Sequence, residues 1–218
     1  MVARMESYVL RVWLPDRPGA LGAVASRIGA VKGDVVGIEI LEIGSGQAVD
    51  ELVVQLPEAT LVELLVSEVR QVDGVQVEEV RPIGPGGHDP RRETLETAAM
   101  LVEATSRKGV LDVACNQAPK SLSASWIAVV DVDAGTTLAA GENAPNQDWL
   151  AAFVHGASSA ASLGGADAGS SDVIWTPVAD VGLAIVAGRD RIVWRERERR
   201  ELVALARIVG LRWAELPA

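Results

Sequence analysis

The segment RPIGPGGHDPRR, residues 81–92, divides the sequence into two parts. It holds three prolines and three glycines among charged residues, and no hydrophobic periodicity passes through it. Proline and glycine at this density interrupt helices and strands, so the segment predicts a linker. It leaves about 80 residues before it and about 125 after it, each enough for a small independent domain. We expect a domain at 1–82, a linker at 83–92 and a domain at 93–218.

The first part alternates between strand and helix patterns. Residues 8–14 alternate apolar and other side chains as a half-buried strand does, and apolar residues then recur at helical spacing at Leu21, Val24, Ile28 and Val31. Two further strands are predicted at 35–43 and 51–56, joined by the glycine-containing turn 44–47. A second helix over 59–69 has Thr60 and Glu63 at capping-box spacing. A last strand covers 75–80.

The order βαββαβ constrains the architecture of the first domain. Two helices that each connect strands of one sheet must lie on the same face of it, because such crossovers are right-handed. The expected fold is therefore α+β and ferredoxin-like, with a four-stranded antiparallel sheet. Trp13 is out of phase with the apolar face of its strand. We expect it on the sheet face away from the helices, beside Arg11, where it is a candidate dimer contact; partial burial by the second domain is the alternative explanation.

The second part predicts the order αββαββα around another antiparallel sheet. A long helical pattern covers 93–121, in which Gly109 could bend or divide the helix, and strands follow at 125–132 and 136–140. A helix over 147–162 has Asn146 as its expected cap. Two strands at 172–178 and 181–187 form a hairpin, and a helix over 192–215 ends the chain.

Composition excludes several classes of protein. The net charge of −10 disfavours a nucleic-acid partner, since an acidic chain repels phosphates. One cysteine, Cys115, cannot form an intramolecular disulfide, which suits a reducing compartment, and we expect it in the core. No apolar stretch approaches the roughly 20 residues of a membrane span, and the N-terminus lacks a signal-peptide pattern. We expect a cytoplasmic protein with no membrane partner.

The stretch DRPGAL, Asp16 to Leu21, is the candidate ligand site. Pro18 suits a first helical position, and the amides of Gly19, Ala20 and Leu21 would point out of the positive end of the helix dipole, where a carboxylate binds well. Asp16 could cap the helix or accept hydrogen bonds from a ligand ammonium group. A zwitterionic amino acid would satisfy both ends. The alternative is that these residues only end the strand and start the helix.

The first domain resembles an ACT domain, an amino-acid-binding regulatory module. The resemblance rests on D-x-P-G-x-L at Asp16–Leu21, the helix that follows, and GDVVGIEI after it, within βαββαβ. It implies a ligand site at an interface between two such domains. The residues implicated are Asp16, Arg17, Pro18, Gly19, Ala20, Leu21, Asp34, Val35 and Val36. The family often has Asn where this chain has Asp34; an ionised Asp only accepts hydrogen bonds and so favours an ammonium group.

The second domain is similar in its element order to a GAF domain, a module that binds small molecules or dimerises. Its short loops leave little chain to enclose a nucleotide-sized pocket of about 300 Å³ or more. We expect no metal, because His155 and His88 have no second ligand at metal-binding spacing. We also expect no cofactor and no chromophore on Cys115, since Cys115 lies in a predicted helix and not in a pocket loop. Asp131 and Asp133 are typical of a turn.

No catalytic fingerprint is present in the sequence. We therefore expect a non-enzymatic regulatory protein, a homodimer, that binds a small amino acid through its ACT-like domain. The GAF-like domain would transmit the signal or hold the dimer. Two alternatives stay open: a scaffold that dimerises or binds another protein without a ligand, and an enzyme whose site the sequence does not reveal.

Overall fold

The chain forms two compact units, residues 1–89 and 90–218, in a computed structural model. Residues 5–83, 90–162, 172–190 and 192–217 are described. The predicted linker falls partly outside this range: residues 84–89, which include His88, are not described, Ile83 ends the strand β4, and Pro90–Arg92 begin the helix α3. Each unit is treated separately below.

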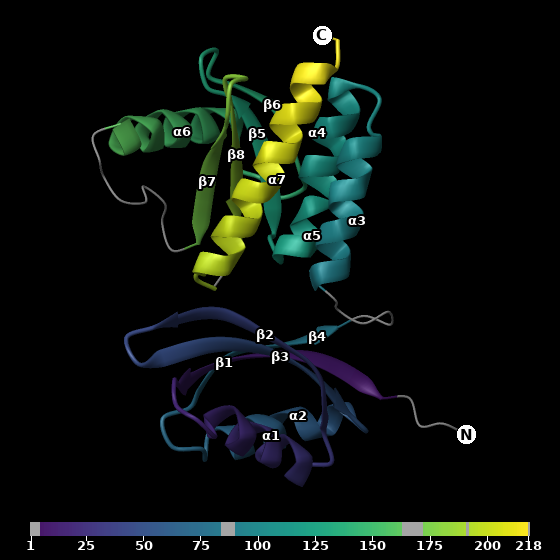
Figure 1. Cartoon of the computed structure of the whole chain (residues 1–218), viewed down its shortest axis with the longest axis vertical. Coiled ribbons are helices and arrows are strands. Elements are labelled where there is room, and N and C mark those ends of the chain that lie inside the picture. Colours follow the sequence, from purple (N-terminus) through teal and green to yellow (C-terminus); the bar gives the residue numbers. More distant parts are fainter. Residues whose placement is uncertain (1–4, 84–89, 163–171, 191, 218) are drawn as a thin grey trace. The chain divides into compact units, whose positions relative to one another are not determined.

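The first unit has the predicted βαββαβ order. Its strands are β1 (Glu6–Pro15), β2 (Asp34–Gly44), β3 (Gln47–Leu56) and β4 (Gln76–Ile83), and its helices are α1 (Ala20–Ala30) and α2 (Val62–Val69), the latter preceded by a short 3₁₀ turn, η1 (Ala59–Leu61). The sheet order is β2-β3-β1-β4, entirely antiparallel, and both helices lie on one face of it (Figure 1). This is the ferredoxin-like α+β arrangement.

Strand alternation separates the two faces of this sheet. Tyr8, Leu10, Val12 and Leu14 of β1 belong to the core beneath the helices, together with Val24 and Ile28 of α1. The alternate residues Val9, Arg11 and Trp13 therefore lie on the opposite face, as the sequence predicts for Trp13 and Arg11. Arg11 donates to Glu51 at 2.8 Å on that face.

Two local predictions in this unit are wrong. Helix α1 begins at Ala20 with Gly19 as its N-cap, so Pro18 precedes the helix instead of occupying its first position. The capping box at Thr60 and Glu63 does not form, because η1 comes first and no side chain caps α2. The Thr60 hydroxyl instead donates to Glu58 at 3.2 Å.

The second unit has the element order αααββαββα. Its helices are α3 (Pro90–Glu103), α4 (Arg107–Asn116), α5 (Ala118–Leu122), α6 (Gln147–Ser162) and α7 (Glu196–Glu215); its strands are β5 (Trp126–Asp131), β6 (Thr136–Ala140), β7 (Val173–Val178) and β8 (Leu183–Gly188). The sheet order is β6-β5-β8-β7, again antiparallel. Helix α6 lies on one face, and α3, α4, α5 and α7 gather on the other (Figure 1).

The sequence predicts the strands of this unit better than its helix boundaries. The expected long helix over 93–121 is three helices, and the first break lies before Ser106, whose hydroxyl accepts from the Gly109 amide at 3.1 Å. Gly109 is thus inside α4, and the chain divides into two helices before it and not at it. Asn146 caps α6 as predicted, accepting from the Trp149 amide at 2.9 Å. Helix α7 begins at Glu196, four residues later than expected.

Candidate functional site

The turn between β1 and α1 is fixed by backbone contacts. The Asp16 amide donates to the Gly46 carbonyl at 3.0 Å, which ties the turn to the β2–β3 hairpin, and the Ala20 amide donates to the Arg17 carbonyl at 3.3 Å. Gly19 has φ of 89°, a left-handed conformation that favours glycine, although a Cβ would meet no atom there. Glycine is therefore required at this position by backbone conformation and not by space.

The N-terminus of α1 is open to an anion. No side chain caps it and its first turn holds no acidic residue. The first helical bond runs from the Ala23 amide to the Gly19 carbonyl, and among the described contacts the amides of Leu21 and Gly22 reach no backbone acceptor. Asp16, Arg17, Pro18 and Gly19 are exposed. Asp16 does not act as the helix cap, so its carboxylate is available beside an unneutralised positive helix end.

Sequence reasoning missed one residue next to this turn, Asp50 of β3. Asp50 pairs with Val12 on one side and Ile40 on the other, and its strand neighbours Ala48 and Leu52 belong to the core beneath the helices. Its side chain therefore lies on the helix face of the sheet. The residue is 3% exposed, and its Oδ1 atom is buried with no hydrogen-bond partner. Extending the inward alternation of the predicted strand 51–56 back by two residues could have found it.

The surroundings of Asp50 disfavour a charge. Burial raises the pKa of its carboxyl above the usual value, and the negative charge of nearby Asp16 raises that pKa further. The strand register agrees with this proximity, because Asp50 lies three residues from Gln47, which pairs with Pro15 directly before Asp16. In the described part of the chain neither carboxylate forms an ion pair, and the nearby Arg17 instead lies 3.8 Å from Asp73, with both side chains exposed.

The structure does not bring the second set of predicted residues to this turn. Asp34 begins β2 and pairs with Gln55, whereas Gly44, at the other end of β2, pairs with Gln47. Gln47 and Gln55 lie eight residues apart on β3, which spans roughly 26 Å at about 3.3 Å per residue. Asp34 and Val36 are exposed, and Val35 packs against the core. Within one chain, Asp16–Leu21 and Asp34–Val36 occupy opposite ends of the sheet.

Strand β2 lies at an edge of the sheet and carries exposed apolar side chains. Four of them are 47–59% exposed: Val36, Ile38, Ile40 and Ile43. The strand is interrupted by irregular register at two points, between Val35 and Gly37 and between Ile40 and Glu42. An apolar edge of this length is a surface on which another strand can pair.

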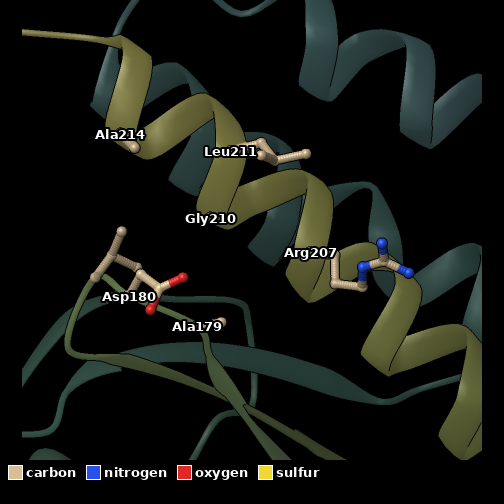
Figure 2. A pocket seen from close by; sticks show the side chains of 7 residues that line it. Ala179, Asp180, Arg207, Gly210, Leu211 and Ala214 are labelled. Carbon is tan, nitrogen blue, oxygen red and sulfur yellow. The ribbon is translucent and has the colours of Figure 1, made fainter.

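A separate pocket lies in the second unit, between the β7–β8 turn and α7. Its volume is about 270 Å³, and Figure 2 shows Asp180 on the turn and Arg207 on the helix, with Leu211 and Ala214 further along α7. The pocket is also lined by Ala179, Val181 and Gly210. This volume is below the usual range for a drug-sized ligand. Asp180 has φ of 66°, so the turn itself holds a left-handed residue.

The remaining sequence candidates occupy structural positions. Cys115 is 2% exposed, and burial raises the pKa of its thiol to about 12, which makes it unreactive at neutral pH. His155 is exposed on α6. The Asp131 carboxylate accepts from the Ala134 amide at 2.8 Å in the turn after β5. Within the described residues, no cluster of three or more His, Cys, Asp or Glu could hold a metal ion, and no helix could span a membrane.

Comparisons with known proteins give structural similarities only. No protein-family model matches the chain, and no curated protein matches it. The ACT domain of a GTP pyrophosphokinase from Chlorobium tepidum aligns over 37% of this chain and all of its own length, at 16% identity and a TM-score of 0.30. The C-terminal domain of MgtC from Mycobacterium tuberculosis aligns over 37% of this chain and 88% of its own, at 16% identity and a TM-score of 0.30.

A protein of unknown function from Galdieria sulphuraria aligns over nearly the whole length. The alignment covers 97% of this chain and 95% of that one, at 12% identity and a TM-score of 0.34. Scores of this size assign no family. The description of the fold rests on the element order and strand pairing of the chain itself.

Proposed function

We propose that the chain is a non-enzymatic regulatory protein whose first unit is an ACT-like module that binds a small amino acid. The observation that carries the proposal is that hydrogen-bond donors for an anion and carboxylates for a cation occur near one turn. The uncapped N-terminus of α1 offers the amides of Leu21 and Gly22 to a carboxylate, and Asp16 and Asp50, which form no ion pair among the described residues, offer carboxylates to an ammonium group. An α-amino acid carries both groups within one small molecule.

The proposal includes a homodimer formed through β2. If two copies pair their β2 edges antiparallel about a twofold axis, the start of one β2 lies beside the end of the other. Asp34, Val35 and Val36 of one copy would then approach the β2–β3 hairpin of the second copy, which is bonded to the Asp16 turn through Gly46. The two predicted sets, separated within a chain, would meet between chains.

The second unit is assigned the role of signal transmission or dimerisation. Its antiparallel sheet between α6 and a group of four helices supports the GAF-like assignment made from element order. Under this assignment, the state of the first unit would change the surface that the second unit presents to a partner.

The second candidate function is a dimerisation scaffold without a ligand. The exposed apolar edge of β2 favours it, because covering four apolar side chains would stabilise a dimer whether or not the Asp16 turn is occupied. The two candidates differ in one respect: only the first requires that small molecules change the stability of the first unit.

A thermal-stability screen of the proteinogenic amino acids with the full chain tests the proposal. A ligand present at one hundred times its Kd should stabilise the protein by about 2.7 kcal/mol. Asp16→Ala should remove the response, and Glu63→Gln, an acidic-to-neutral change on α2, serves as the matched control. Absence of any response at millimolar concentrations would favour the scaffold. A strict monomer in a mass measurement across concentrations would contradict the proposed interface.

A further inference from the structure

The ligand site holds more negative charge than the ammonium of a neutral amino acid can balance. Asp16 lies on the turn before α1, and Asp50 lies on β3 three residues after Gln47, which pairs with Pro15 at the end of β1; neither has an ion-pair partner among the described residues. Asp50 is the more informative of the two. It is only 3% exposed, and Oδ1 has no hydrogen-bond donor, which is costly for a buried carboxylate. A bound cation would supply the missing donor.

Asp50 lies deeper in the first unit than Asp16 does. Asp16 is on the exposed turn, held to Gly46 in the hairpin, whereas Asp50 lies three residues into β3 and faces the core between Val12 and Ile40. A single ammonium group at the exposed turn can be bound by Asp16 alone. To pair with Asp50, the ligand needs a second positive group on a side chain that reaches further into the protein.

The surface beside Asp50 suits an aliphatic stem. Ile40 is its direct cross-strand neighbour on β2, so both side chains lie on the helix face of the sheet, and Ile38 lies two residues along the same strand. Both isoleucines are about half exposed. Methylene groups can lie against such a surface while the charged end of the side chain reaches a carboxylate, as lysine and arginine side chains do in proteins.

We propose that the amino acid bound at this turn is basic. Its α-carboxylate binds the amides of Leu21 and Gly22, its α-ammonium binds Asp16, and its side-chain cation binds Asp50 across Ile40. This inference rests on the proposed function, because it names the ligand class of the same site. In the paired dimer, Asp34 of the second copy adds a third carboxylate at the proposed interface, which further favours a cationic ligand.

Titration calorimetry of the full chain with four amino acids tests the inference. The probes are lysine, ornithine, arginine and norleucine, since norleucine has the carbon chain of lysine without its side-chain ammonium. At least one basic amino acid should bind ten- to hundredfold more tightly than norleucine, about the value of one charge-assisted hydrogen bond. Asp50→Asn should remove this preference, because it keeps the shape of the side chain and removes its charge. Glu63→Gln should keep it.

The outcomes separate the inference from the proposed function. If norleucine binds as tightly as every basic probe, or if Asp50→Asn leaves the preference unchanged, the inference is wrong and amino-acid binding stands. If none of the four probes nor any other proteinogenic amino acid binds, both are wrong. Because Asp50→Asn removes a buried charge, we expect the variant to fold; an unchanged amide spectrum outside the β1–α1 turn and β3 verifies this.

Discussion

Replacement of Asp50 by valine should stabilise the first unit. The substitution removes a buried carboxyl whose Oδ1 has no partner and places an apolar side chain between Val12 and Ile40, in a row that is otherwise apolar. A buried polar group without a hydrogen bond costs about 1–3 kcal/mol. Asp50→Val should therefore raise the free energy of unfolding by about 1–3 kcal/mol at pH 7. Most substitutions of buried residues have the opposite sign.

The stability gained by Asp50→Val should increase as pH rises from 4 to 7. Because the pKa of Asp50 is raised in the folded state, the folded protein holds this proton at pH values where the unfolded chain has lost it. The contribution of Asp50 to wild-type stability therefore falls as pH rises through the unfolded value of about 3.9 and levels off above the folded pKa. The valine variant lacks this dependence, so its advantage should be largest at pH 7 and should narrow towards pH 4.

Urea unfolding followed through the backbone amide signals of β1 and β3 measures this effect in the first unit alone. Five of the six tryptophans lie in the second unit, so total fluorescence would not isolate it. In a unit of this size each kcal/mol corresponds to about 4–8 °C in Tm, which gives a second readout. A loss of stability in Asp50→Val at pH 7, or a difference that stays constant between pH 7 and pH 4, would refute the reasoning.

Four further substitutions or reactions have expected outcomes. Arg189→Met should cost about 3–5 kcal/mol in chemical unfolding of the second unit, because it breaks the buried ion pair in which Arg189 binds Glu198 at 2.6 and 2.7 Å; a loss under 1 kcal/mol would contradict this. Gly19→Ala should lower the free energy of unfolding of the first unit, measured by thermal unfolding, by about 1–2 kcal/mol, because alanine is strained at this left-handed φ. Asn146→Ala should cost about 1 kcal/mol through the lost cap, seen as faster amide exchange at the start of α6. Cys115 should react with a thiol reagent at pH 8 only after unfolding, and rapid reaction of the native protein would show that its thiol is accessible.

Periodicity allowed most elements to be predicted from the sequence. Alternation in residues 8–14 and the helical spacing of Leu21, Val24 and Ile28 depend on which side chains enter the core, and the core dominates folding. The strand β6 and the helix α6 have the predicted bounds. Helix starts were less predictable. Pro18 suited a first helical position and Thr60 suited a cap, yet each helix begins at a different residue.

The sequence also did not reveal that the predicted helix over 93–121 is divided into three helices. Apolar residues recur at helical spacing across α3, α4 and α5, and this pattern does not reveal that Ser106 and Gln117 separate three helices. Short helices that pack on one core share the periodicity of a single long helix. Local hydrogen bonds, such as that from the Gly109 amide to Ser106, decide between the two arrangements.

The candidate site was predicted in part. The turn Asp16–Gly19 and the open N-terminus of α1 followed from residue types, but Asp50 did not, because a polar residue before a predicted strand reads as part of a turn. The separation of Asp34 from Asp16 follows from topology: β1 ends at one end of the sheet, α1 returns, and β2 begins at the other end. In the proposed dimer, a second copy would bring the two together.

Amide chemical-shift mapping of the full chain during titration with lysine is the most direct test of amino-acid binding at the β1–α1 turn. Binding as proposed should shift the amides of Asp16, Leu21, Gly22 and Asp50 together, with one saturation curve, and Asp16→Ala should remove these shifts. Shifts confined to the pocket around Asp180 and Arg207, or no shifts with lysine or any other amino acid at saturating concentration, would contradict the account.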